Sequence, residues 1–139
     1  MRLPLALVAF LAASTIAACG SDSTAPSTSS NPSVQGSWTL KTVNGGGLPA
    51  TLQAANPKVE VVDDQYSFNA DGTYSEQGHI RTTQGAAVTT LAEVEIGVWT
   101  QTGNTIRTVA TADGTVTSLV ISGSSLTATQ SGFTLVYGR

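Results

Sequence analysis

Two kinds of residue in this chain of 139 could carry acid–base or metal chemistry: a single histidine and scattered carboxylates. His79 lies on the same face of a predicted strand as several polar residues, so we expect it on the surface. No serine elbow, cysteine nucleophile or second histidine accompanies it at the spacing that catalysis or a metal centre requires. We therefore do not expect an enzyme, and we expect neither a metal site nor a cofactor.

The acidic residues form small groups: Glu60, Asp63 with Asp64, and Glu93 with Glu95. A carboxylate pair can act as a general acid and base or bind calcium. Because these groups stand in predicted strands, we expect a β-bulge near Asp63 and Asp64 and solvated strand faces elsewhere. Six Lys plus Arg against nine acids leave a net charge of −3 without a basic patch, so nucleic acid is not an expected partner.

The only cysteine, Cys19, follows a short positive start at Arg2 and an uncharged run from Leu3 to Ala18. This order is typical of a secretory signal peptide, and the run is shorter than the ~20 apolar residues of a membrane span. The sequence Ile-Ala-Ala-Cys at 16–19 resembles the bacterial lipobox. The resemblance implies cleavage before Cys19, a diacylglycerol on its thiol and an acyl chain such as palmitate on the new amine. An ordinary secreted protein is the alternative.

The chain divides into three parts: a signal peptide at 1–18, a lipidated Cys19 with a flexible tether at 19–33, and one domain at 34–139. The tether contains mostly Ser, Thr, Pro, Gly, Asp and Asn, which cannot form a core. The lipobox resemblance implies a lipid-anchored protein of the cell envelope. Since Gly20 rather than Asp follows the cysteine, it implies the outer membrane, facing the periplasm, in a diderm organism.

Strand patterns fill the domain, which contains 18 of the 21 threonines and frequent turn signals such as Asp-Gly and Gly-Asn. Apolar and polar residues alternate, as in antiparallel strands with one buried face. The sequence predicts an all-β fold, an eight-stranded antiparallel up-and-down barrel, with a two-sheet sandwich as the alternative. The predicted strands are 36–43, 58–69, 72–82, 91–101, 104–111, 115–121, 125–130 and 133–138.

Large apolar side chains on the inward parity of these strands are the candidate ligand-binding residues. They would line a cavity for a small hydrophobic ligand, or simply fill the core. They are Trp38, Leu40, Tyr66, Phe68, Tyr74, Ile80, Ile96 and Val98.

Two long connections, 44–57 and 83–90, fall at the same end of an up-and-down barrel, because successive connections alternate between its ends. We expect the mouth of any cavity there, with Gly45–Gly47 giving the first loop backbone freedom. A short helical turn within 48–55 is allowed, since Pro49 could start one.

The segment Gly36-Ser37-Trp38 resembles the Gly-x-Trp signature of lipocalins, and Phe68–Tyr74 and Gly97–Thr100 resemble internal segments of small lipocalin-like (calycin-type) domains of bacterial lipoproteins. The resemblance implies that a basic side chain packs on Trp38, with Arg139 as the first candidate and Arg107 as the second. It suggests a membrane-anchored barrel that binds a small hydrophobic ligand, and we expect this barrel to be a monomer. The alternative is a structural or interaction lipoprotein with a filled barrel.

Overall fold

The computed structural model describes residues 32–139, which form nine β-strands joined by turns and loops. The predicted signal peptide, Cys19 and most of the predicted tether lie outside the described residues. Within the described part, no helix is long and apolar enough to cross a membrane. The strands are β1 (Gly36–Val43), β2 (Ala50–Gln53), β3 (Lys58–Phe68), β4 (Thr73–Gln84), β5 (Ala87–Thr102), β6 (Thr105–Ala110), β7 (Val116–Ser122), β8 (Ser125–Gln130) and β9 (Phe133–Gly138).

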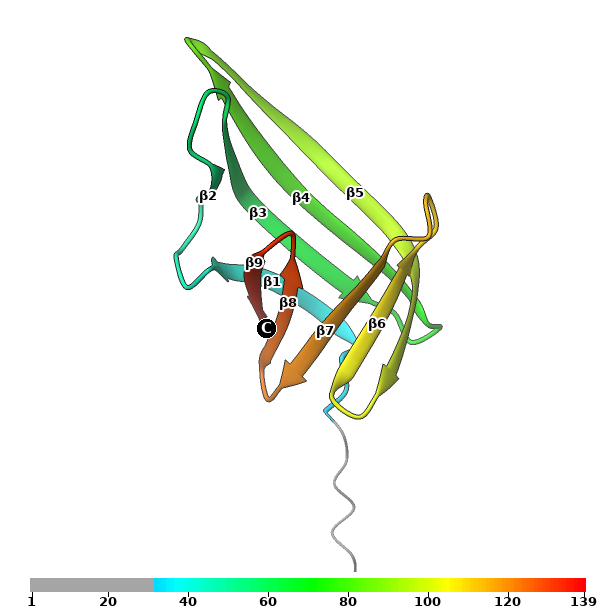
Figure 1. Cartoon of the computed structure of the whole chain (residues 1–139). Coiled ribbons are helices and arrows are strands. Elements are labelled where there is room, and N and C mark those ends of the chain that lie inside the picture. The colour runs from blue at the N-terminus through cyan, green and yellow to red at the C-terminus, as the bar shows by residue number, and fades with distance from the viewer. Residues whose placement is uncertain (1–31) are drawn as a thin grey trace, which may run out of the picture.

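The strands form one closed antiparallel barrel (Figure 1). Each strand from β3 to β9 pairs with the next, and β1 closes the ring by pairing with β9 on one side and β3 on the other. The predicted eight-stranded up-and-down barrel is confirmed, and the sandwich is excluded. The additional strand β2 pairs with β3 at Val59–Val61, beyond the stretch of β3 that pairs with β1.

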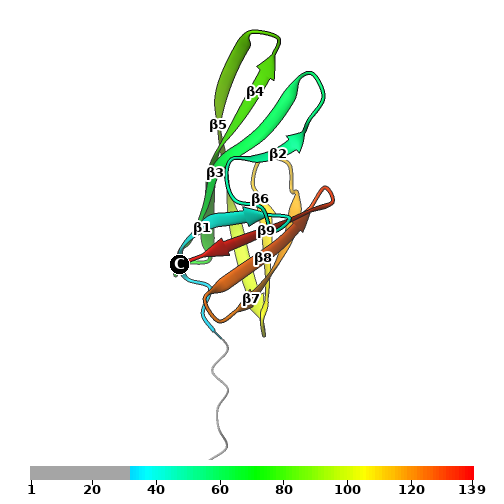
Figure 2. The ribbon, with the colours of Figure 1, turned by 90° about the vertical axis from the view of Figure 1, so that its left-hand side faces the viewer.

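Three long strands rise above the rest of the barrel (Figures 1 and 2). β3, β4 and β5 contain 11, 12 and 16 residues, whereas β6 to β9 contain six or seven. Their upper parts form a curved sheet, which we call the extension, made of residues 58–63, 79–84 and 87–92 together with β2. The barrel is therefore closed at its lower end and open to one side at its upper end.

Two predicted connections differ from the observed ones. The predicted loop at 83–90 is wrong, because β4 continues to Gln84 and β5 begins at Ala87, with Gly85 at φ 59° in the tight turn between them. The segment 48–55, where the sequence allows a helical turn, contains β2 instead. In both places hydrogen bonding to a long neighbouring strand stabilises extended backbone that has few turn residues.

A bulge in β3 decides which carboxylates face inward. The register with β4 shifts between Val61 and Asp63, close to the predicted position. Val61 and Asp64 are both buried, while Asp63 is exposed and lies 2.7 Å from Nδ1 of the exposed His79. The extra residue thus places Asp64 in the interior without turning Val61 outward.

The lower half of the barrel is filled by aromatic and aliphatic side chains. Tyr66 stacks on Phe68 with ring centroids 5.4 Å apart and meets Tyr137 edge-on at 5.2 Å. Trp38 is fully buried, its Nε1 donates to Val34 O over 2.6 Å, and the Arg139 guanidinium lies 4.1 Å from its ring centroid. The predicted contact between Arg139 and Trp38 is confirmed.

Candidate functional site

A cavity of about 640 Å³ occupies the upper half of the barrel. It is bordered by Leu52 in the β1–β3 connection, by the β6–β7 turn at Ala112 and Asp113, and by the β8–β9 turn at Ser131. The cavity opens at the end predicted from the parity of the connections. Of the two segments expected at its mouth, 44–57 contributes to the lining, whereas no residue of 83–90 does.

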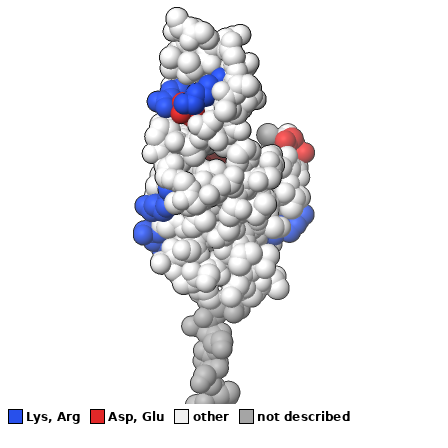
Figure 3. Space-filling view, turned by 60° about the vertical axis from the view of Figure 1, so that its left-hand side comes forward, with Lys and Arg blue, Asp and Glu red and all other residues white. Residues whose placement is uncertain are grey.

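The lining of this cavity is strongly acidic. Six acidic residues border it together with His79, and no lysine or arginine does. Asp64, Glu76, Glu93 and Glu95 lie on the inward face, whereas Asp63 is exposed beside His79 and Asp113 lies in the exposed β6–β7 turn. On the face shown in Figure 3 few acidic atoms are visible. The six carboxylates are Asp63, Asp64, Glu76, Glu93, Glu95 and Asp113.

Strand register brings four of these carboxylates together. Tyr66, Glu76 and Glu95 lie side by side on β3, β4 and β5, so two glutamates face each other across neighbouring strands. In the next inward row Asp64 lies opposite Gly78, which lies opposite Glu93. The missing side chain at Gly78 leaves room for Asp64, because a Cβ there would lie 3.1 Å from Asp64 Oδ1.

Tyrosines from the aromatic core support the carboxylates from below. The Tyr137 hydroxyl donates to Asp64 Oδ2 over 2.7 Å, and the Tyr74 hydroxyl donates to Glu95 Oε1. The backbone N–H of Gln65 also donates to Asp64 Oδ1 over 2.8 Å. These hydrogen bonds hold the acidic groups in place at the boundary between the filled and the hollow half of the barrel.

The carboxylates differ in how readily they ionise. Burial, followed by the nearby charge of Asp64, raises the pKa of Glu76 to about 8. Burial also raises the pKa of Asp64, against the hydrogen bond from Tyr137. At neutral pH the Glu76 carboxyl therefore keeps its proton. It can still ionise and add one negative charge to the cavity.

The cavity also has an apolar wall. Ile80 and Val61 face it from the extension, directly opposite each other on β4 and β3. Leu52 belongs to β2, and Phe133 and Leu135 belong to β9 on the far side. A ligand in the cavity would thus meet carboxylates along one side and aliphatic or aromatic carbon along the other.

The predicted burial of Ile96 and Val98 is wrong. Their side chains are 59% and 54% exposed, whereas Gly97 between them is buried. A Cβ at Gly97 would lie 2.7 Å from the Tyr74 ring, so position 97 faces inward and its neighbours face outward. The inward parity of β5 therefore includes Glu93 and Glu95. The apolar interior expected at the mouth is acidic on this side.

Two of the eight predicted ligand-binding residues border the cavity: Ile80, and Ile96, whose side chain is exposed. Ile80 is half-buried in the cavity wall. Trp38, Leu40, Tyr66, Phe68 and Tyr74 are buried in the core instead.

Glu76 is the central site residue that the sequence analysis did not single out. The alternation of faces along this strand could have identified it. His79 and the residues two apart from it face outward, so position 76 lies on the inward face together with Tyr74. The residue was missed because glutamate is polar, and a polar residue on the inward face breaks the usual alternation of apolar and polar residues.

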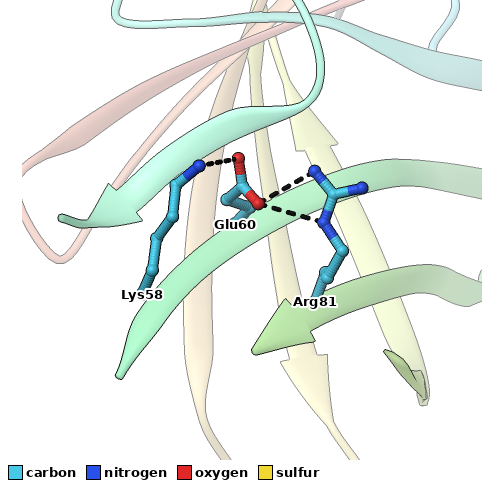
Figure 4. Close-up of polar contacts among 3 residues, drawn as sticks. All are labelled: Lys58, Glu60 and Arg81. Atoms are coloured by element: carbon cyan, nitrogen blue, oxygen red, sulfur yellow. Dashed lines mark hydrogen bonds and ion pairs between the residues drawn. The ribbon is translucent and has the colours of Figure 1, made fainter. Parts of the chain in front are cut away.

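On the outer face of the extension, the buried carboxylate of Glu60 is fully paired. Lys58 Nζ lies 2.7 Å from Glu60 Oε1, and Arg81 contacts Glu60 Oε2 at 2.8 Å and 3.0 Å (Figure 4). Hydrogen bonds from Lys58 and then Arg81 lower the pKa of Glu60. This group joins β3 to β4 and is separate from the acidic cavity.

Among residues 32–139, no group of three or more His, Cys, Asp or Glu side chains is placed to hold a metal ion. A comparison with protein-family models and with curated protein sequences returns no match to this chain. The chemistry of the cavity is therefore the basis for a functional assignment.

Proposed function

We propose that this protein is a ligand-binding β-barrel that takes up a small organic amine in its acidic cavity. The observation that carries the proposal is the cavity of about 640 Å³, which four inward-facing carboxylates border without a lysine or arginine and which an apolar wall closes on one side. An ammonium group would neutralise the carboxylates, and its hydrocarbon part would cover Val61, Ile80 and Phe133.

The state of Glu76 supports a cationic ligand. Its carboxyl is protonated at neutral pH because ionisation beside Asp64 and Glu95 is unfavourable in a partly buried site. A bound ammonium would reverse this preference, so that binding of the amine releases a proton. Inorganic cations fit less well, because a metal ion needs ligands that converge on one point.

A filled barrel acting only as an interaction protein is the second candidate. The packed aromatic cluster of Tyr66, Phe68 and Tyr137 is consistent with it in the lower half. The hollow upper half favours ligand binding, since packed interiors leave few voids larger than a water molecule.

We also propose that the protein is a lipoprotein of the cell envelope, anchored through Cys19, with a lipocalin-like domain. The lipobox at 16–19 supports the anchor, and the stacking of Arg139 on Trp38 supports the lipocalin-like assignment. In a diderm organism the anchored domain would face the periplasm from the outer membrane.

The experiment compares three probes with the same hydrocarbon chain: octylamine, octanol and octanoate. Binding to the protein is measured by calorimetry and by tryptophan fluorescence at pH 7. We expect octylamine to bind, octanol to bind more weakly and octanoate not to bind. If octanol binds as tightly as octylamine, the site binds a small hydrophobic ligand, as expected from the sequence, and does not select an amine. No binding of any probe would favour the interaction protein.

Two variants test whether the carboxylates select the amine. Glu76→Gln and Glu95→Gln should weaken octylamine binding about tenfold each, the effect of a lost interaction of about 1.4 kcal/mol. Asp71→Asn is the matched control, because it removes one negative charge in an exposed turn at the other end of the barrel. If Asp71→Asn weakens binding as much, the effect is one of net charge and not of the cavity.

A further inference from the structure

The upper half of β5 has a free edge. β5 pairs with β4 from Ala87 to Val98, but with β6 only from Gly97 to Thr102. Among the described strands nothing pairs with the other side of residues 87–95, as Figure 1 shows for the upper part of this strand. An unpaired strand edge exposes a row of N–H and C=O groups that can accept another strand.

This edge carries few of the features that normally prevent strand addition, the inward-pointing Glu93 and Glu95 being the exception. Residues 87–95 contain no proline, lysine or arginine, and Val88, Leu91 and Val94 are 62%, 59% and 67% exposed. The edge at β2 differs, because β2 has only four residues and its register shifts between Thr51 and Gln53. Short, irregular edges are protected, whereas a long apolar edge favours pairing.

The orientation of the free backbone groups follows from one hydrogen bond. Thr111 N–H donates to Ile96 O over 2.9 Å, so the polar groups of Ile96 point away from β4. Because these groups alternate along a strand, those of the even-numbered residues 88, 90, 92 and 94 also point to the free edge. A partner strand must place its own free groups opposite these four residues.

We infer that the partner is a second copy of this chain, which pairs antiparallel with residues 87–95 about a two-fold axis at Leu91. In this register Val88 lies opposite Val94 of the second copy and Thr90 lies opposite Ala92. All four are even-numbered, so their free backbone groups face each other and can form about eight hydrogen bonds. Residues 87–95 of each copy therefore supply hydrogen-bond partners for residues 87–95 of the other copy.

Side chains are complementary in the same register. The outer face pairs valine with valine and threonine with alanine. On the inner face Leu91 meets Leu91 of the second copy, and Glu93 lies opposite Thr89. No glutamate faces a glutamate across the interface, so the association avoids the repulsion that would oppose it. The result is a dimer with one sheet continuous through both extensions, in place of the monomer expected from the sequence.

Cysteine cross-linking tests the register. In the full chain with Cys19→Ala, an introduced Leu91→Cys would be the only cysteine, and the two Cα atoms of a non-hydrogen-bonded pair are about 4.5 Å apart, within disulfide range. Val98→Cys is the matched control, because its side chain is 54% exposed but its strand is paired on both sides. We expect mild oxidation to give a dimer with Leu91→Cys only. Equal yields from the two variants would overturn the pairing.

A charge exchange tests the same pairing without cysteines. Val88→Lys alone and Val94→Glu alone should each reduce the dimer measured by sedimentation in detergent. The double variant should restore it, because the introduced lysine of each copy would face the introduced glutamate of the other. Failure of the double variant to recover, or a wild-type chain that sediments as a monomer, would overturn the inference and leave the edge available to a strand of another protein.

Discussion

Glu76 lies directly opposite Tyr66 on adjacent strands, and both side chains face the interior at the boundary between the aromatic core and the acidic cavity. On its other side Glu76 lies opposite Glu95. A carboxyl between a buried ring and a second carboxylate is poorly placed to ionise. The proton on Glu76 should therefore be coupled both to folding and to the binding of a cation.

The stability of the protein should fall as the pH rises from about 5 to about 9. The folded state holds the Glu76 proton up to a pKa of about 8, whereas the unfolded chain loses it near the ordinary value of 4.5. Folding therefore binds a proton between these values, and the free energy of unfolding decreases by at most roughly 1.4 kcal/mol per pH unit. Urea unfolding at pH 5, 7 and 9 should show this slope in the wild type and a flatter one in Glu76→Gln. Identical slopes would contradict the prediction.

Proton release should accompany amine binding. Since an ammonium in the cavity favours ionised Glu76, octylamine should bind more tightly at pH 9 than at pH 6, because an alkylamine is still mostly protonated at both. Calorimetry in two buffers of different ionisation enthalpy would count the released protons. Glu76→Gln should abolish the dependence on buffer, and a wild type without buffer dependence would argue against this coupling.

Replacing Arg139 should destabilise the lower end of the barrel. Its guanidinium lies over the buried Trp38 ring and also donates to Ser33 O. Arg139→Ala should lower the free energy of unfolding by about 0.5–2 kcal/mol, the range of a cation–π contact. Arg107→Ala, on the exposed outer face of β6, is the control and should leave stability unchanged. An equal loss in both variants would indicate a general effect of charge.

Gly97 should tolerate no side chain. An added Cβ would lie 2.1 Å from Val109 O and 2.7 Å from the Tyr74 ring, where β5 and β6 approach closely. Gly97→Ala should therefore cost about 1–3 kcal/mol or more in thermal or urea unfolding. Gly47→Ala has no atom within 4 Å of its Cβ and should behave like the wild type. A stable Gly97→Ala would mean that β6 can move away without loss of packing.

Cys19 should carry the membrane anchor. Cys19→Ala should move the protein from the detergent phase to the aqueous phase in phase partitioning, because the acyl chains would be lost. Mass spectrometry of the wild-type N-terminus should find the modified cysteine as the first residue. An unmodified Cys19, or cleavage at another site, would contradict the lipoprotein assignment.

The alternation of residues and the turn signals favoured a barrel, with a sandwich as the alternative that only the pairing of β1 with β3 and β9 excludes. In β1, Trp38 and Leu40 alternate with Ser37, Thr39 and Lys41, and the observed burial follows this pattern. Glycine turns at 72, 103 and 123, all with positive φ, separate the strands at the lower end. These signals are local, so strand order, the end that carries the mouth and the position of Trp38 could be read from them.

The face of β5 could not be read in the same way. Val94, Ile96 and Val98 alternate with Glu93 and Glu95, and hydrophobicity alone assigns the apolar side chains to the interior. Pairing with β4 and the contact of Gly97 with Tyr74 turn the glutamates inward instead. The sequence by itself therefore determined eight of the nine strands and the tight turns of the lower end, and it favoured a barrel over a sandwich. Only the tertiary structure decided which face of β5 surrounds the cavity, because that depends on register and close packing between strands and not on the composition of one strand.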